Sequence, residues 1–468
     1  PSGTGVAGDG GSCDYYAGFI GNNKGTVTIN DLKFDNANVD IKPVTTSLNS
    51  TGSSILAVVV ANNNGTLVYN DVDVHNSTVK GYTKAGILHG FTQKGSFVAN
   101  HCAIINSEVV VEADGSDKEA ALNAAIIGYD GNNLAKTNGI KLENVTGTID
   151  ESVAWSGGIE TKNDGTKYSG SWGIYSPTYT HDSYGTATVP MVAAIDGYQY
   201  ESLTDAVTAA KNGETVTLLK DTKEDITIPS GKTITLDLNG KTLTNKDDHT
   251  ILNNGDLTIT GAGTVDNVSH QKGALYNKGT VVVNGGTFDR SKENGKDSKD
   301  SGANSWYTIK NVGSMTIHDG ATVQTAGNNN TLGKFSSLVS NGYFNAGDYT
   351  NNRGLDQPIL TIDGGTFRGG LNTIKNDDRA KLTISGGTFS NYYQAVVQNH
   401  NIAEITGGTF TAASDAEKET YGIYNCGCAA NIDLGTLTVS GGTFTGATYA
   451  VAEVSSENAD VTISGGQF

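Results

Sequence analysis

The segment Leu382-Thr-Ile-Ser-Gly-Gly-Thr-Phe389 decides the fold, because near-copies of it recur through the second half of the chain. The shortest intervals between copies are about 20–25 residues, and no helical pattern lies between them. A repeat of this length predicts a β-solenoid, in which each coil stacks on the one before it. The other copies end at Val265, Phe288, Val323, Phe367, Phe410, Phe444 and Phe468.

Apolar and polar residues alternate within each copy. Leu382 and Ile384 point to one side of a strand, whereas Thr383 and Ser385 point to the other. Stacking the copies therefore predicts two apolar columns in the core, and the Gly-Gly pair supplies the positive φ of a tight corner. Between the apolar columns runs a mostly hydroxyl column that faces water: Thr258, Val282, Thr316, Thr361, Thr383, Glu404, Thr438 and Thr462.

An asparagine ends the apolar stretch that precedes each copy. Stacked side-chain amides can hydrogen-bond along a column and satisfy the backbone at a corner, so a structural role is predicted. The last copy departs from this pattern and has Glu453 near the same place. The asparagines of the column are Asn253, Asn277, Asn311, Asn341, Asn376, Asn399 and Asn425.

The first part of the chain repeats with another phrase, NDLKFDNANV, which begins at Asn30. Further copies begin at Asn70 and Asn100, and a degenerate copy begins at Ile140. Cys102 is predicted to be a buried small hydrophobe rather than a nucleophile or ligand. Aligned copies share an inward position (Leu32, Val72 and Cys102) and a corner (Asn36, Asn76 and Asn106).

The predicted fold is all-β: a right-handed parallel β-helix in two consecutive arrays with one short capping helix. Residues 1–154 form the N-terminal repeats, 155–191 a linker or irregular joint, and 192–468 the C-terminal β-helix. A capping box at Ser202–Asp205, an apolar stripe and Gly213 predict a helix near 202–212. Such a helix would cover the open end of the solenoid.

Composition excludes several classes of protein. The net charge of -18 argues against a nucleic-acid partner, which requires a basic face. The longest apolar run, Ile55–Ala61, is far shorter than the roughly 20 residues of a membrane span. The 4 cysteines are too few for a disulfide framework.

The opening of the second array resembles a known family. The segment from Ala194 to Val207 (AIDGYQYESLTDAV), followed by GETVTLLKD, DITIPSGKTITLDLNGKTLTN and the GGTF copies, is similar to the β-helix domains of large secreted surface proteins of Gram-positive gut bacteria. These domains are called adhesin-like or pectate-lyase-like, and the resemblance covers about residues 190–468. It implies a modular, surface-displayed fragment of a larger secreted protein, but no particular activity.

Aromatic residues gather beside the insertions between copies. Aromatic faces next to polar groups suit sugar rings, which present C–H patches and hydroxyls, so a glycan site is one interpretation. The alternative is that these side chains only pack loops onto the coils. The predicted ligand-binding residues are Trp306, Tyr343, Tyr349, Tyr392, Tyr393 and Tyr421, and Tyr307 and Phe344 lie among the wider group.

One cluster predicts catalysis as an alternative. Aligning Asn376 with Asn399 stacks Asp377 under His400, with Asp378 and Arg379 adjacent. Carboxylates, a histidine and an arginine in one patch can perform general acid–base chemistry. Polygalacturonase-like β-helix hydrolases use such groups, but their Asn-Thr-Asp and Gly-His-Gly signatures are absent from this chain.

Cofactor signals are weak. Oxygen-rich segments at Asp130 and Gly347 could hold Ca²⁺, although no EF-hand spacing occurs. Cys426 and Cys428 lack two further ligands for zinc, and their disulfide state stays open. An ice-binding face is a further idea, but Val282 and Glu404 interrupt the threonine column.

The residues therefore leave three functions open. The preferred hypothesis is a non-enzymatic cell-surface module that binds a glycan or a host or microbial surface ligand. The alternatives are a β-helix polysaccharide hydrolase or lyase, and a structural spacer of a larger surface protein. The sequence does not determine the oligomeric state.

Overall fold

The computed structural model divides into two compact units, 1–206 and 207–468. The predicted joint at 155–191 lies almost entirely outside the residues that the structure describes, so the predicted domain boundaries stay a prediction. The described residues are 15–40, 54–81, 84–92, 95–111, 122–124, 127–130, 135–149, 154–156, 159–161, 171–172, 191–294, 306–328, 335–344, 350–413, 419–426, 435–454 and 460–468.

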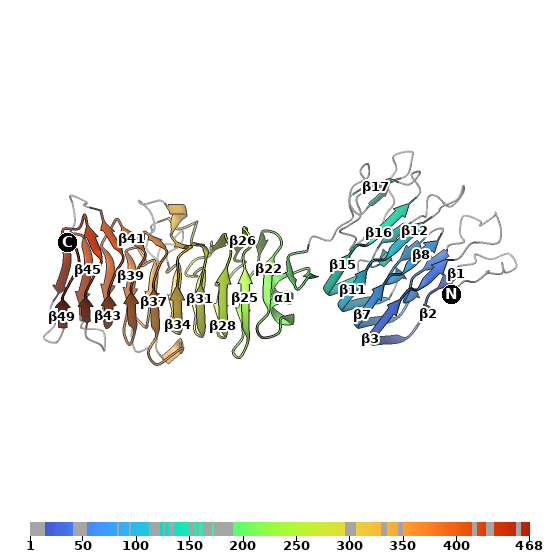
Figure 1. Ribbon diagram of the computed structural model, residues 1–468, viewed down its shortest axis with the longest axis horizontal. Coiled ribbons are helices and arrows are strands. Elements are labelled where there is room, and N and C mark those ends of the chain that lie inside the picture. Colours follow the sequence, from blue (N-terminus) through green and yellow to red (C-terminus); the bar gives the residue numbers. More distant parts are fainter. Residues whose placement is uncertain are drawn as a thin grey trace. The chain divides into compact units, whose positions relative to one another are not determined.

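The first unit is a stack of four coils, and each coil contributes one strand to each of four parallel sheets (Figure 1). The first two coils are β1 (Tyr15–Ala17), β2 (Ile20–Asn23), β3 (Thr26–Asp35) and β4 (Asn38–Asp40), then β5 (Ser54–Leu56), β6 (Val60–Asn63), β7 (Thr66–His75) and β8 (Thr78–Gly81). The next two are β9 (Lys84–Gly86), β10 (His89–Thr92), β11 (Ser96–Ile105) and β12 (Glu108–Val111), then β13 (Leu122–Ala124), β14 (Ile127–Asp130), β15 (Ala135–Glu143) and β16 (Thr146–Ile149). Short antiparallel pairings involve β17 (Ala154–Ser156), β18 (Ile159–Thr161), β19 (Ser171–Trp172), β20 (Ala193–Ile195) and β21 (Tyr198–Tyr200).

The predicted alignment of the first three N-terminal copies is confirmed. Leu32 pairs with Val72, and the pairs Asn100–Asn70 and Ala103–Asp73 place Cys102 opposite Val72. In the fourth copy Asn138 pairs with Asn100 and Ile140 with Cys102, so that copy is in register from Asn138, two residues before its predicted start. Cys102 is fully buried, and burial raises the pKa of its thiol to about 12, as a core residue requires. The corner asparagines Asn36, Asn76 and Asn106 have φ values of 55°, 48° and 48°, a region that asparagine tolerates better than most residues.

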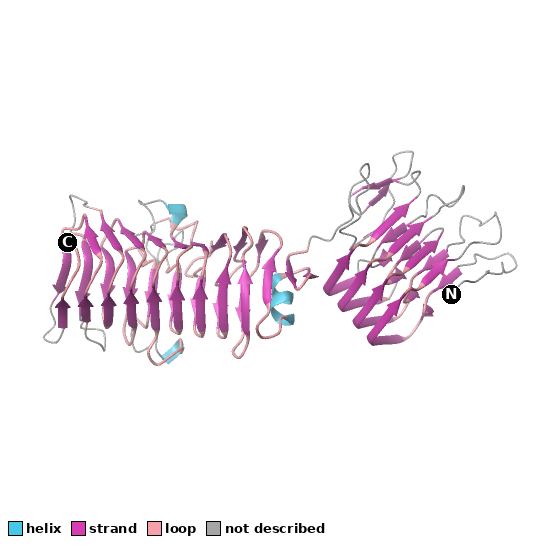
Figure 2. Ribbon diagram, in the orientation of Figure 1, coloured by secondary structure: helices cyan, strands magenta, loops and turns pink. Residues whose placement is uncertain are grey.

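The second unit has three strands per coil and three parallel sheets, so the predicted parallel β-helix is confirmed (Figure 2). We call these sheets S1, S2 and S3. S1 contains β22 (Thr215–Leu218), β25 (Thr233–Asp237), β28 (Asp256–Thr260), β31 (Thr280–Val283), β34 (Ser314–Ile317), β37 (Ile359–Ile362), β40 (Lys381–Ile384), β43 (Ile402–Ile405), β46 (Thr436–Val439) and β49 (Asp460–Ile463).

The other two sheets run along the same coils. S2 contains β23 (Thr222–Lys223), β26 (Lys241–Thr244), β29 (Gly263–Asp266), β32 (Gly286–Asp289), β35 (Ala321–Val323), β38 (Thr366–Arg368), β41 (Thr388–Asn391), β44 (Thr409–Ala412) and β47 (Thr443–Thr445). S3 contains β24 (Ile226–Ile228), β27 (Ile251–Asn253), β30 (Leu275–Asn277), β33 (Ile309–Asn311), β36 (Val339–Asn341), β39 (Asn372–Asn376), β42 (Ala395–Asn399), β45 (Tyr421–Cys426) and β48 (Tyr449–Val454). A short 3-10 helix, η2 (Ala326–Asn328), follows β35.

Columns of like residues fill the core of the second unit. In S1, Leu382 pairs with Leu360 and Ala403, and all three side chains are buried as predicted. In S2, the phenylalanines of successive copies stack with nearly parallel rings. Their centroids are 4.8 Å (Phe367–Phe389), 4.9 Å (Phe389–Phe410) and 4.5 Å (Phe410–Phe444) apart. Aromatic rings at the coil spacing therefore form a continuous internal stack.

The predicted asparagine column is confirmed as a buried amide ladder at the end of S3. Each of its seven members is fully buried. Asn341 Nδ2 donates to Asn376 Oδ1 at 2.8 Å and to Lys381 O at 3.0 Å, and this pattern repeats along the stack. The ladder ends on the Glu453 carboxylate, which accepts from Asn425 at 2.7 Å. The amides thus satisfy buried corner groups that water cannot reach.

The predicted helix is also confirmed, as α1 (Leu203–Ala209). The Ser202 hydroxyl caps it by accepting a hydrogen bond from the backbone N–H of Asp205 at 3.0 Å. At the other end, the Lys232 ammonium donates to the carbonyls of Val207, Thr208 and Ala210 at 3.0, 2.8 and 2.7 Å. The C-terminal turn of α1 is thereby attached to the turn between β24 and β25.

Candidate functional site

A groove of about 370 Å³ lies on the outer face of S3. Lys375 of β39 and Gln398 of β42, which line it, alternate with the inward-facing Ile374 and Val397, both fully buried. The residues that line it are Tyr307, Phe335, Ser336, Ser337, Phe344, Leu371, Asn372, Lys375, Gln394, Gln398 and His400.

Two insertions on either side of β36 supply the walls of the groove. Phe335 precedes β36 and is 45% exposed, and Phe344 follows β36 and is 50% exposed. The neighbour of Phe344, Tyr343, anchors the second insertion because its backbone forms an antiparallel bridge with Asp378. Two exposed phenylalanines therefore line the groove together with polar side chains.

A network of charged groups lies beneath the groove. Lys310, Ser340 and Lys375 occupy the same register position on β33, β36 and β39. Lys310 Nζ donates to Ser340 Oγ at 3.0 Å, and Ser340 Oγ donates to Asp377 Oδ2 at 3.1 Å. Lys375 Nζ lies 2.8 Å from Asp377 Oδ1 and 4.6 Å from the centroid of the Phe344 ring. These contacts hold Lys375 between a buried carboxylate and an aromatic face.

His400 lines the groove, and Cys426 contacts His400 without lining the groove itself. Cys426 Sγ lies 3.5 Å from His400 Nδ1, and both residues are buried. Burial lowers the pKa of His400 to about 4; Asp377 opposes this shift, and Lys375 adds to it. The imidazole is consequently neutral at pH 7.

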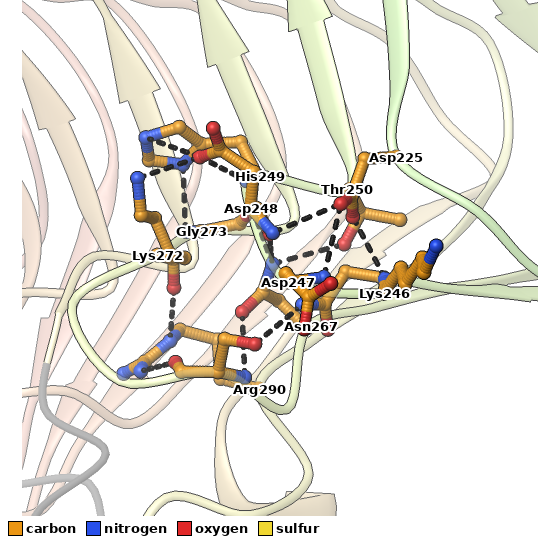
Figure 3. Close-up of polar contacts among 12 residues, drawn as sticks. Asp225, Lys246, Asp247, Asp248, His249, Thr250, Asn267, Lys272, Gly273 and Arg290 are labelled. Carbon is orange, nitrogen blue, oxygen red and sulfur yellow. Dashed lines mark hydrogen bonds and ion pairs between the residues drawn. The ribbon is translucent and has the colours of Figure 1, made fainter.

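A second polar cluster organises loops on the earlier coils (Figure 3). The Asp225 carboxylate accepts from the backbone N–H groups of Lys246, Asp247 and Asp248 at 2.7, 2.9 and 3.0 Å. Asp248 also pairs with Lys272 at 2.6 Å. The three hydrogen bonds of the Asp225 carboxylate all fix the backbone of one loop, so the cluster has a structural role.

The same cluster contains a buried arginine that fixes the backbone at Trp306. The Arg290 guanidinium donates to the carbonyls of Lys272 and Trp306 at 2.8 and 3.0 Å and pairs with Glu293. The Trp306 side chain packs against His249, with centroids 4.8 Å apart. Burial lowers the pKa of His249 to about 4. Trp306 therefore packs this loop and does not line the groove.

The other predicted ligand-binding aromatics are dispersed. Tyr343 is 1% exposed, and its hydroxyl donates to Leu355 O at 2.9 Å, so its geometry matches the packing alternative. Tyr421 stacks on Tyr449, and its hydrogen bond to Glu419 raises the pKa of the Tyr421 phenol to about 12.

The remaining three of those aromatics add little to the groove. Tyr392 and Tyr393 are half-buried and immediately precede Gln394, which lines the groove. Tyr349 lies outside the described residues. The groove instead uses Tyr307, Phe335 and Phe344. Phe335 was missed altogether, although its place at the edge of an insertion is the signal that could have found it.

The predicted catalytic patch is brought together in part. Asp377 and His400 follow Asn376 and Asn399, which pair in register, so the two lie on adjacent coils as expected. Asp377 and Asp378 are fully buried, and neither lines the groove. Arg379 takes a left-handed φ of 62° at the turn that follows. Of the four residues, only His400 lines the groove.

Hydroxyl columns run along two faces of the second unit. The S1 column is interrupted at Val282 and Glu404, as the sequence indicates. An unbroken threonine column on S2 was missed; its first member precedes Leu243, and each of the others precedes the phenylalanine or valine that had marked the repeat. Its members, in register, are Thr242, Thr264, Thr287, Thr322, Thr366, Thr388, Thr409 and Thr443.

The metal predictions fall largely on residues that the structure does not describe. Residues 131–134, residues 345–349 and Cys428 are among them. Within the described ranges, no group of three or more His, Cys, Asp or Glu side chains could hold a metal ion. No helix in the described part of the chain is long and apolar enough to cross a membrane.

Comparisons with known proteins do not add to this description. No family model, no curated protein and no solved structure matches the chain. The resemblance to adhesin-like β-helix domains therefore stays a prediction from the sequence.

Proposed function

We propose that this chain is a non-enzymatic module of a bacterial cell-surface protein and that the groove on S3 binds a glycan. The observation that carries the proposal is that two exposed rings, Phe335 and Phe344, line one groove together with polar side chains. Aromatic faces cover the apolar C–H patches of a sugar ring. The amides of Asn372, Gln394 and Gln398 can exchange hydrogen bonds with its hydroxyls.

Burial of the carboxylates favours binding over hydrolysis. Hydrolysis of a glycosidic bond normally requires two carboxyl groups that both reach the scissile bond. Asp377 is fully buried in its ion pair with Lys375, and Asp378 is fully buried beside the backbone of Tyr343. Of the predicted catalytic residues only His400 lines the groove, so a hydrolase or lyase acting there would use His400, and its substitution tests that alternative. A protein that serves only as a spacer would bind no ligand in the groove.

The test is a glycan array combined with an assay for reducing ends and unsaturated products on the same polysaccharides. Substituting both Phe335→Ala and Phe344→Ala should abolish binding, because these rings provide the exposed apolar walls. Phe19→Ala is the matched control, since Phe19 is 63% exposed in the other unit.

Each outcome of this assay separates two functions. Binding that is lost in the double variant, without product, supports the proposal. Product formation that His400→Ala abolishes would replace it with the enzymatic alternative. An array without signal would leave a protein ligand or the spacer role.

A further inference from the structure

Three side chains that line the groove, an imidazole and two amides, lie beside the buried thiol of Cys426. Cys426 ends β45, whereas Gln398 and Asn372 lie on β42 and β39. Gln398 and Tyr424 pair in register, so Gln398 lies diagonally across from Cys426 on the outer face of S3. This arrangement brings a nucleophile close to a carboxamide.

The thiol has a base beside it. Cys426 Sγ lies 3.5 Å from His400 Nδ1 and 3.9 Å from Nε2. A neutral imidazole at hydrogen-bond reach can accept the thiol proton as the sulfur attacks and pass it to the leaving nitrogen.

The carboxamide of Gln398 is arranged as the electrophile. Its Nε2 lies 3.9 Å from Cys426 Sγ. Its Oε1 accepts a hydrogen bond from Asn372 Nδ2 at 2.7 Å, which polarises the carbonyl and would stabilise an oxyanion there. Reacting atoms attack from roughly 3–3.5 Å, so the reaction requires a rotation of the Gln398 side chain that turns its amide carbon toward Sγ.

We propose that Cys426 and Gln398 form an intramolecular thioester and that this bond captures a primary amine that enters the groove. In the first step the bond from Sγ to Cδ forms and the bond from Cδ to Nε2 breaks. Ammonia leaves with the thiol proton, which His400 transfers. In the second step the amine nitrogen attacks Cδ, the carbon–sulfur bond breaks, and the thiol recovers a proton from the amine. No oxidant or reductant takes part.

Asn372 also indicates that the molecule that attacks the thioester is an amine. Its side chain is 1% exposed and lines the groove, and its Oδ1 accepts no hydrogen bond from the described residues. A buried acceptor without a donor is costly, and an incoming amine N–H would satisfy it. This second observation is independent of the thiol, and the inference does not depend on whether the groove also binds a glycan.

The experiment is intact-mass spectrometry of the freshly purified chain, followed by incubation with methylamine. The thioester makes the chain lighter than its sequence by one ammonia. Methylamine should then add to the Gln398 side chain and release one alkylatable thiol at Cys426, and peptide mapping identifies both sites. Water can also hydrolyse the thioester at the Gln398 amide carbon, which converts Gln398 to glutamate. Glutamate at position 398 in the wild type but not in Cys426→Ala would therefore also support the proposal.

Two variants make the result specific. Cys426→Ala should have the full sequence mass and no methylamine adduct, whereas Cys102→Ala, which removes the buried thiol of the other unit, should keep both signals. A wild-type chain of full sequence mass with Gln398 unmodified and no adduct would overturn the proposal. That measurement uses the wild type alone and so holds even where a variant does not fold.

Discussion

Replacing Asn341 by leucine should destabilise the second unit strongly, because this asparagine lies in the middle of the buried amide ladder. Its Nδ2 donates to Asn376 Oδ1 and to Lys381 O, at 2.8 and 3.0 Å. Its Oδ1 accepts from Asn311 Nδ2 at 2.7 Å. Leucine has a similar size but can make none of these hydrogen bonds.

The expected cost follows from the groups left behind. The substitution removes the donor to Asn376 Oδ1, which is buried, and to Lys381 O, where the hydrogen bond is only partly buried. An unsatisfied buried polar group costs about 1–3 kcal/mol, so Asn376 Oδ1 alone predicts a loss of that size, to which Lys381 O adds less because water reaches it in part. Asn311 Nδ2 retains Ile359 O and Gly313 O as acceptors and adds little to this cost.

The measurement is urea unfolding combined with native-state hydrogen exchange of β36 and its neighbours. Coils contact mainly their neighbours, so exchange should accelerate first around the substituted coil. Asn70→Leu is the matched control, because Asn70 belongs to a ladder on the outer surface of the first unit, where it donates to Asn30 at 2.8 Å. Water replaces that hydrogen bond, so the expected cost is below about 1 kcal/mol. Equal costs for the two substitutions would refute the assignment of stability to burial of the ladder.

Three further substitutions test other parts of the fold. Burial lowers the pKa of His89 to about 4, below its ordinary 6.5, so stability of the first unit should fall as the pH drops from 6.5 to 4. The loss should reach up to about 3 kcal/mol, and His89→Gln should remove this pH dependence in urea unfolding at pH 4.5 and 7.5. Phe389→Ala leaves a gap in the buried ring stack and should cost about 3–5 kcal/mol in urea unfolding; a loss below about 1 kcal/mol would contradict the packing argument. Lys232→Met removes the cation at the C-terminus of α1 and should accelerate amide exchange in that helix, at a cost of about 1–2 kcal/mol, whereas unchanged exchange would show that the ammonium does not hold it.

The sequence alone predicted the all-β fold, the apolar columns, the amide ladder and the capping helix. The physical reason is that a solenoid places each residue above and below its own copy, one coil away. Asn376 therefore meets Asn399, and Leu382 meets Leu360, wherever the copies align. Alignment of the copies also placed Asp377 and His400 on adjacent coils without any knowledge of the structure.

Only the tertiary structure decided what lies on the outer face of S3. Phe335 and Phe344 come from insertions that break the repeat, so no copy indicates where their chains turn. The backbone bridge between Tyr343 and Asp378 buries two residues that had been candidates for surface chemistry and leaves Phe344 to form a wall. Periodicity determines contacts between equivalent positions of neighbouring coils, whereas an insertion takes its place from non-repeating contacts that exist only in the folded chain.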